Sequence, residues 1–336
     1  MTDTPQARST GIGSWPGRDM LKALQISFAE SPDLPYLPEL PDRGPQAAMI
    51  GRTSAVLSGL ALDLQPAGWR LTDAPGRDQR TARALLREDL DLLEEVAQGY
   101  TGVIKYSFAG PWTLAASVER PRGDRVVGDS GARRDLVQSL AEGLGQLVRE
   151  MTRRLPNTTA LVQLDEPALP AVMTGGVHTA SGLSRHRSID RPELSQTIGY
   201  VVDLLGADVG VAVHCCAAGL PIDLMQAAGV QAVLVDLEQL NVADWDLVAA
   251  ALEAGLWFGA GAVPTAGGAA LTTLSADEVA DRALRRLRSL ELEPAVAGQI
   301  LITPACGLAG FEPASALHVL RSIRTAADIV TEQLAQ

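Results

Sequence analysis

The chain has 336 residues, a net charge of −12 and 46% hydrophobic residues. This length suits one large α/β barrel or two average domains, and the apolar content excludes a disordered protein. The acidic surplus argues against nucleic acid or an anionic membrane as a partner. We expect a cytoplasmic protein, because the chain has neither a run of about 18 apolar residues nor a signal-peptide pattern. An odd set of three cysteines in a reducing compartment excludes a disulfide framework.

Short apolar runs alternate with longer amphipathic stretches along the whole chain. Eight of these runs predict strands: Gly11–Trp15, Leu34–Leu40, Val103–Phe108, Ala160–Leu164, Val209–Val213, Ala232–Leu237, Leu256–Val263 and Ile300–Thr303. Apolar spacings of three and four predict helices over Arg77–Gln98, Arg133–Arg153, Arg191–Leu205, Pro221–Ala228, Val242–Ala254, Ala276–Leu290 and Pro313–Gln333. Asp190 and Ser275 are the expected N-caps of two of them.

This alternation predicts a single (β/α)8 barrel domain over residues 1–336, because strands that alternate with helices form a parallel sheet with helical cover. A doubly wound sheet is the main alternative. It would normally carry a glycine-rich phosphate turn after its first strand. The segment Gly11-Ile12-Gly13 is too short a match, since Pro16 occupies the place of the third glycine.

Reactive side chains recur at the carboxyl ends of the predicted strands, where barrel enzymes place their active sites. They are Ser14, Glu39, Asp165, Glu166, His214, Cys215, Cys216, Glu238 and Cys306. This recurrence predicts a functional site at that end of the barrel.

Histidine, thiolate and carboxylate are the ligands that zinc prefers. His214 and Cys216 lie two residues apart on a strand end, so both can face one ion while Cys215 turns into the packing. Glu238 ends the neighbouring strand and Cys306 ends the last strand across the barrel mouth. The sequence therefore favours a zinc site. The alternative is that the cysteines are small core residues and His214 is a hydrogen-bonded core residue.

Polar groups at other strand ends favour an amino-acid ligand. One carboxylate of the Asp165-Glu166 pair faces inward, where it could bind an ammonium group or act as a base. Glu39 is a weaker candidate of the same kind. The small residues around Ser14 allow backbone N–H groups to approach a carboxylate. The alternatives are a solvated acidic pair and an ordinary turn.

Taken together, these residues resemble the cobalamin-independent methionine synthase family, whose zinc barrel is related to that of uroporphyrinogen decarboxylase. The matching segments run in family order from residue 11 to residue 308. They are Ile12-Gly13-Ser14-Trp15-Pro16, Leu164-Asp165-Glu166-Pro167-Ala168-Leu169, His214-x-Cys216, Glu238 and Pro304-Ala305-Cys306-Gly307-Leu308.

The resemblance implies a zinc-dependent methyltransferase that makes methionine from homocysteine. It implies zinc ligation by His214, Cys216, Glu238 and Cys306. It further implies that Ile12 and Ser14 bind the substrate carboxylate and that Asp165, with Glu39 as a second acid, binds its ammonium group. Zinc would keep the homocysteine sulfur as a thiolate, because a thiol is a poor nucleophile.

The chain departs from the family pattern in two ways. It lacks the additional N-terminal half of full-length members, which helps to hold the folate donor. It also lacks the family's histidine after strand 7, where the sequence reads Phe258-Gly259-Ala260-Gly261-Ala262-Val263-Pro264-Thr265. It therefore resembles short single-domain members. The methyl donor is left open between methyltetrahydrofolate and methylcobalamin or a corrinoid protein.

Three other functions stay open at this point. The first is zinc-dependent alkyl transfer to another small thiol of the coenzyme M type. The second is metal-free decarboxylation of a tetrapyrrole, against which the paired cysteines weigh. The third is a non-catalytic zinc or homocysteine-binding barrel.

Overall fold

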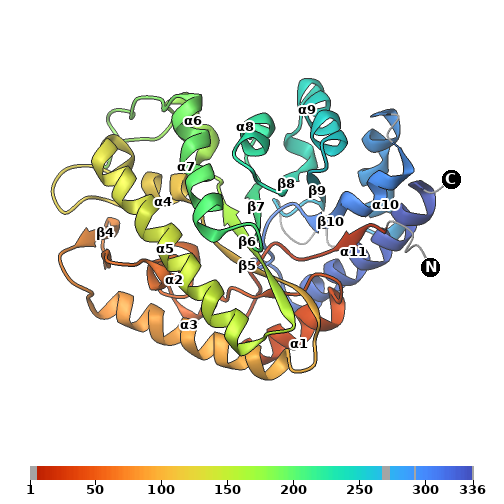
Figure 1. Cartoon of the computed structure of the whole chain (residues 1–336), viewed down its shortest axis with the longest axis horizontal. Coiled ribbons are helices and arrows are strands. Elements are labelled where there is room, and N and C mark those ends of the chain that lie inside the picture. Colours follow the sequence, from red (N-terminus) through yellow and green to blue (C-terminus); the bar gives the residue numbers. More distant parts are fainter. Residues whose placement is uncertain (1–5, 267–272, 291–292, 335–336) are drawn as a thin grey trace.

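Eight parallel strands run through the centre of the computed structural model, which describes residues 6–266, 273–290 and 293–334, and helices surround them (Figure 1). The strands are β1 (Arg8–Ser9), β2 (Tyr36–Leu37), β5 (Gly102–Ala109), β6 (Thr158–Asp165), β7 (Gly210–Cys215), β8 (Ala232–Asp236), β9 (Trp257–Val263) and β10 (Ile300–Pro304). Their order in the sheet is β1-β10-β9-β8-β7-β6-β5-β2. A parallel bridge between Ser14 and Glu39 joins the two ends of this order, so the strands form a ring. The predicted barrel architecture is confirmed.

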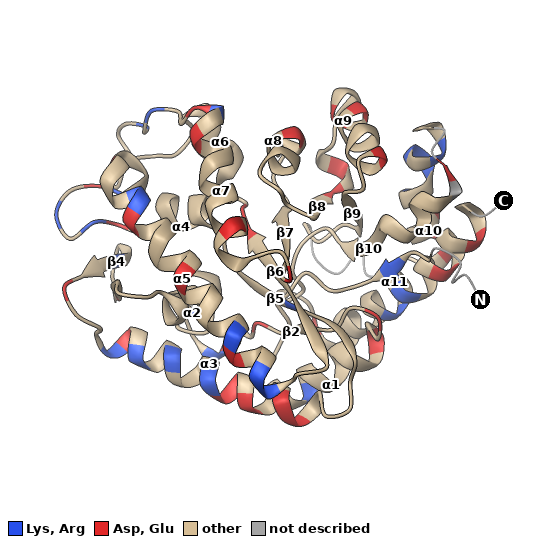
Figure 2. Ribbon diagram, in the orientation of Figure 1, with Lys and Arg blue, Asp and Glu red and all other residues tan. Residues whose placement is uncertain are grey.

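The helices lie outside the ring and follow its strands in alternation (Figure 1). They are α1 (Met20–Glu30), α2 (Met49–Val56), α3 (Arg77–Val96), α4 (Pro111–Ser117), α5 (Ser130–Arg154), α6 (Leu169–Thr174), α7 (Arg191–Leu205), α8 (Ile222–Ala227), α9 (Val242–Glu253), α10 (Ala276–Leu287) and α11 (Pro313–Leu334). Many of the charged residues lie on this outer layer, with both signs along α3 (Figure 2). All seven predicted helices are present. No helix in the described residues is long and apolar enough to cross a membrane.

Both predicted N-caps are confirmed. The side chain of Ser275 accepts a hydrogen bond from the backbone N–H of Glu278, and the Glu278 side chain returns a contact to Ser275. Asp190 accepts from the backbone N–H of Glu193 at the start of α7. Each cap satisfies an N–H group that the first turn of a helix leaves without an internal partner.

The structure differs from the sequence-based prediction on the N-terminal side. Helices α1, α2, α4 and α6 and the antiparallel hairpin β3 (Ala61–Gln65) and β4 (Gly68–Thr72) were not predicted. Strand β1 precedes the predicted run Gly11–Trp15. Within that run the carbonyls of Gly11 and Ile12 accept hydrogen bonds from the Lys105 side chain, and the chain rejoins the ring at Ser14 through its bridge with Glu39.

The interior of the ring differs from the packing between strands and helices. A small apolar cluster of Ile12, Ala212, Ala232 and Leu234 is separate from the main core. Val233 and Val235, which alternate with two of these residues along β8, belong to the main core outside the ring. Since side chains alternate along a strand, even-numbered residues of β8 face the barrel interior.

Candidate active site

Three potential metal ligands meet at the carboxyl end of the barrel. His214 is the fifth residue of β7, Cys216 follows that strand, and Cys306 follows β10. One ligand atom from each residue lies within 4.8 Å of the other two. The Sγ atoms of Cys216 and Cys306 are 3.4 Å apart, and both cysteines are free. A histidine with two thiols is a donor set suited to zinc.

The imidazole of His214 is oriented as a ligand. Its Nδ1 lies 3.2 Å from the carbonyl oxygen of Leu234. Among the described residues no group forms a hydrogen bond with its buried Nε2. Because metal-bound histidines usually donate their second N–H to a carbonyl or carboxylate, this contact leaves the Nε2 lone pair for an ion. The unpartnered atom therefore fits a metal.

The pKa values of the two thiols shift in opposite directions. The Cys306 thiol, which donates to Cys216 Sγ, and the nearby His214 ring together lower the pKa of Cys216 to about 4. The same interaction with Cys216, together with burial, raises the pKa of the Cys306 thiol. The direction of this shift favours the thiolate of Cys216, the form that binds metal ions.

Cys215 lies on the other face of β7, in the main core. Its thiol donates to the carbonyl of Ala217 at 3.5 Å, and burial raises its pKa to about 12. A neutral buried thiol of this kind acts as a small apolar side chain.

The structure does not bring Glu238 to the three ligands. Strand β8 ends at Asp236, and the short helix η3 (Leu237–Gln239) directs Glu238 outward. There its carboxylate is about half exposed and lies 2.5 Å from the guanidinium of Arg282. Asp236 is the carboxylate on the interior face of β8, two residues after Leu234. It is buried, and burial, with smaller effects from the charges of Glu238 and Cys216, raises the pKa of Asp236, while its hydrogen bonds from the Glu238 backbone N–H and the Gln239 side chain oppose this shift.

The ligand cluster opens into a pocket of about 160 Å³. All four residues predicted to bind the amino acid line this pocket together with the cluster: Ile12, Ser14, Glu39 and Asp165. Within the described part of the chain, the backbone N–H groups of Gly13 and Ser14 donate to no protein acceptor. Free N–H groups beside two carboxylates are suited to a ligand that carries both a carboxylate and an ammonium group.

The carboxylate of Glu39 is buried at the edge of this pocket. Burial raises its pKa to about 7, while the Arg52 guanidinium opposes the shift and the Asp165 carboxylate adds to it. Two buried carboxylates near one another favour a cation between them, because each disfavours the charge of the other.

Asp165 and Glu166 separate as predicted into an inward and an outward side chain. Asp165 lines the pocket, and its Oδ1 accepts from Gln163 Nε2 at 2.7 Å. Glu166 lies outside the pocket and accepts from the backbone N–H groups of Trp112 and Thr113 at 2.9 and 2.7 Å. The second carboxylate therefore caps helix α4 and is structural.

Sequence reasoning missed two buried polar residues beneath the pocket. Lys105 and Gln163 are both fully buried inside the ring, and their side chains are 2.6 Å apart. The available signal was a charged residue within the otherwise apolar run Val103–Phe108. Buried lysines are rare unless they are paired.

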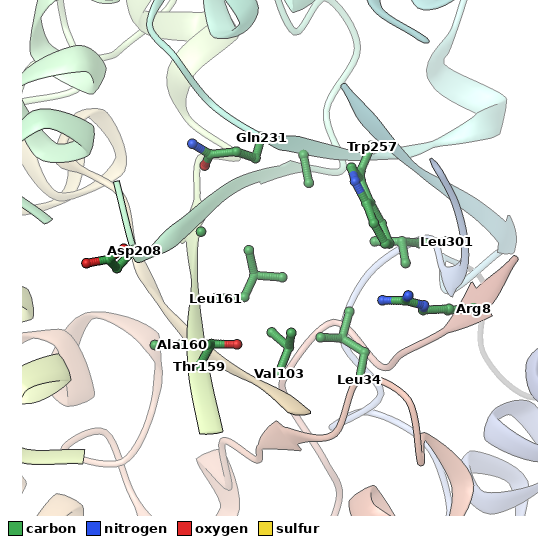
Figure 3. A pocket seen from close by; sticks show the side chains of 12 residues that line it. Arg8, Leu34, Val103, Thr159, Ala160, Leu161, Asp208, Gln231, Trp257 and Leu301 are labelled. Atoms are coloured by element: carbon green, nitrogen blue, oxygen red, sulfur yellow. The ribbon is translucent and has the colours of Figure 1, made fainter. Parts of the chain in front are cut away.

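A larger pocket of about 260 Å³ lies at the opposite end of the barrel (Figure 3). It is lined by residues from the first positions of the strands, among them Arg8, Ala160, Gly210, Ala232 and Trp257. In the view of Figure 3 its walls are mostly apolar side chains. Because catalytic groups of these barrels come from the carboxyl ends of the strands, the smaller pocket is the candidate active site.

The profile of the "cobalamin-independent synthase, catalytic domain" matches residues 104–329. The chain belongs to the cobalamin-independent methionine synthase family. This membership makes the protein an enzyme of a methyltransferase family whose substrates are homocysteine and a methyl donor. Because the family is cobalamin-independent, it gives no support to the corrinoid-protein donor that the short chain suggested.

Solved structures support the fold. A B12-independent methionine synthase from Shewanella sp. W3-18-1, in complex with selenomethionine, is 14% identical with a TM-score of 0.64. The match covers 98% of this chain and 99% of that chain. The intracellular xylanase TsXylA from Thermoanaerobacterium saccharolyticum is 10% identical, with a TM-score of 0.36 over 92% of this chain and 90% of its own. That second similarity carries no argument about function. No curated protein sequence matches the chain.

Proposed function

We propose that this protein transfers a methyl group to the sulfur of L-homocysteine and releases L-methionine, with Zn²⁺ as its metal. One observation carries the proposal: the unpartnered Nε2 of His214 and two thiols meet in a pocket that also contains two buried carboxylates. The family, whose catalytic domain methylates homocysteine, supports it.

His214, Cys216 and Cys306 would hold the metal. Asp236 is the carboxylate that we propose in place of Glu238, because it is on the interior face of β8 and near Cys216. When bound, zinc would supply a Lewis acid that lowers the pKa of the substrate thiol, so that it reacts as a thiolate at neutral pH.

The amino-acid end of homocysteine would lie across the pocket from the cysteines. We assign its carboxylate to the loop of Ile12 and Ser14, whose neighbouring backbone N–H groups are free, and its ammonium group to Asp165 and Glu39. Two charged anchors fix the position of the sulfur for in-line attack on the methyl carbon. The selenomethionine in the Shewanella structure is an analogue of the product and supports an amino-acid ligand here.

The protein side of catalysis is then mainly positioning. The anchors would hold the thiol with its sulfur towards the cysteines. The segment that follows β9, Pro264-Thr265-Ala266, carries no titratable side chain for protonating a leaving group.

We further propose that residues 1–336 act as one catalytic domain and that the enzyme works in the cytoplasm. Helices and strands of one ring account for the described residues from Arg8 to Leu334. A reducing compartment would keep the thiols of Cys216 and Cys306, 3.4 Å apart, from forming a disulfide before the metal binds.

The decisive experiment measures zinc content and homocysteine methylation on the same preparation. We expect about one zinc per chain and methionine formation, and we expect Cys306→Ser to lose both. Methyltetrahydrofolate, its polyglutamate, methylcobalamin and a methylated corrinoid protein are compared as donors. Full activity in a zinc-free preparation would overturn the proposal. Unchanged homocysteine affinity in Asp165→Ala would point instead to a different thiol as the acceptor.

A further inference from the structure

A fully buried lysine lies beneath the pocket and has no part in the chemistry proposed above. Lys105 Nζ donates to the carbonyl oxygens of Gly11 at 2.7 Å and Ile12 at 2.8 Å. It also donates to Gln163 Oε1 at 2.6 Å. All three protons of the ammonium group therefore have acceptors inside the barrel. A buried cation is costly to maintain, so its contacts call for an explanation.

The first set of contacts fixes the backbone that borders the pocket. Because a trans peptide directs its C=O and N–H groups in opposite directions, the carbonyl of Ile12 facing Lys105 turns the N–H of Gly13 away from it. Ser107 Oγ supports the same carbonyl at 3.0 Å. Gly13 lines the pocket, and its N–H is free within the described part of the chain.

The contact of Lys105 with Gln163 leads to Asp165, the proposed binding group for the substrate ammonium. Because an ammonium group can only donate, the amide oxygen of Gln163 faces Lys105 and its amide nitrogen faces away. That nitrogen donates to Asp165 Oδ1 at 2.7 Å and to the Ile12 carbonyl at 2.9 Å. One ammonium group thus orients both the loop at Ile12 and the carboxylate of Asp165.

We infer that Lys105 is a positioning residue for the α-amino-acid head group: it holds the backbone N–H of Gly13 towards the substrate carboxylate and, through Gln163, the carboxylate that binds the substrate ammonium. This inference rests on the proposed amino-acid substrate. Its positive charge lies behind the two peptide groups and favours an anion on their N–H side. Lys105 consequently makes the site specific for ligands that carry both charges.

The test compares ligands that lack one charge. L-methionine, its decarboxylated analogue 3-(methylthio)propylamine and its deaminated analogue 4-(methylthio)butyrate are titrated calorimetrically into the enzyme as purified, Lys105→Met and Gln163→Leu. In Lys105→Met we expect the preference for L-methionine over the amine to fall at least about tenfold, which is the scale of one charge-assisted hydrogen bond. In Gln163→Leu we expect the preference for L-methionine over the acid to fall about as much.

The controls separate positioning from simple filling of the barrel. Lys22 is the only other lysine in the chain and is exposed on α1, so Lys22→Met makes the same chemical change elsewhere and leaves both preferences unaltered. If Lys105 only fills space, Lys105→Met lowers the affinities for L-methionine and for the amine by the same factor, and the inference is overturned. If Lys105→Met does not fold, Gln163→Leu decides: unchanged preferences overturn the inference. A wild-type enzyme that fails to bind L-methionine refutes the proposed function instead.

Discussion

At the scale of single residues, the charged groups of the candidate site lie at different depths in the barrel. Lys105 lies at the bottom of the interior, the carboxylates of Asp165 and Glu39 lie above it, and the thiols are at the mouth. Burial lowers the pKa of Lys105 to about 7 and raises that of Glu39 to about 7. Small changes of pH near neutrality therefore alter the charge of the empty site.

We predict that L-methionine binding weakens as the pH falls below 7. The empty site then holds a proton on Glu39, and a ligand ammonium must displace it, so the affinity falls by up to about tenfold per pH unit. Lys105, whose pKa is also lowered to about 7, gains a proton over the same range, so Glu39→Gln is needed to isolate the contribution of Glu39. Calorimetry between pH 5.5 and 7 measures the slope. Glu39→Gln should flatten it, and an unaltered slope in that variant would contradict the assignment.

We predict that Asp236→Asn weakens zinc binding at least about tenfold, whereas Glu238→Gln leaves it within about twofold. Asp236 is on the interior face of β8, and Glu238 pairs with Arg282 outside. Loss of one charged ligand reduces metal affinity strongly. Competition with a chromophoric chelator measures both variants, and the absorption spectrum of the cobalt-substituted protein reports the ligand set independently. The reverse order of the two variants would restore Glu238 as the ligand.

At the scale of secondary structure, the site depends on how strands end and helices begin. Strand β6 ends in Asp165, which lines the pocket, and the next residue, Glu166, caps helix α4. The glycine before α4 allows this contact, because a Cβ at Gly110 would lie 2.4 Å from Glu166 Oε1. Of these adjacent carboxylates, Asp165 thus serves the proposed binding site and Glu166 stabilises the fold.

We predict that two amide substitutions at this strand end affect different properties, stability in one case and ligand affinity in the other. Glu166→Gln should reduce the free energy of unfolding by about 1–3 kcal/mol, because an amide keeps one acceptor oxygen for the donors of Trp112 and Thr113. Asp165→Asn should leave stability nearly unchanged and reduce L-methionine affinity. Urea unfolding and calorimetry on both variants make the comparison. Equal losses of stability would contradict the assignment of ligand binding to Asp165 and helix capping to Glu166.

At the scale of the whole molecule, the proposed metal connects distant parts of the ring. Cys216 follows β7 and Cys306 follows β10, and two strands lie between β7 and β10 in the sheet. The ring itself is held by strand pairing along its whole circumference, so we expect it to form without an ion.

We predict that chelation of the metal abolishes methyl transfer and leaves the fold intact. The metal-free protein should keep its far-ultraviolet circular dichroism, and its Tm should fall by roughly 5–10 °C, because a ligand that binds only the folded state adds its binding free energy to stability. Scanning calorimetry with and without zinc measures the shift. Collapse of the circular dichroism spectrum on chelation would show that the metal is required for folding.

The barrel was predictable because its strands are buried on both faces and read as apolar runs between amphipathic helices. The early elements were harder, since β1 and β2 have two residues each and the hairpin β3–β4 interrupts the alternation of strands and helices. The position of reactive residues at the ends of predicted strands indicated that His214, Cys216 and Cys306 lie together, as the structure has them. It did not show that Glu238 lies apart from these three residues, because one short helical turn after Asp236 directs its side chain outward. The contacts of Lys105 with residues more than 90 positions away could only come from the structure.

The ring closes where its two shortest strands meet. The parallel bridge there consists of two backbone hydrogen bonds, from Trp15 to Glu39 at 2.8 Å and from Glu39 to Gly13 at 3.0 Å. The proposed anchors Ser14 and Glu39 lie on the two sides of this seam. A bound amino acid would therefore connect the two sides of the seam, and we expect the empty protein to open there first. Substrate supply would then set the resistance of this enzyme to proteolysis, and the lifetime of the protein in the cell would follow the concentration of its own substrate.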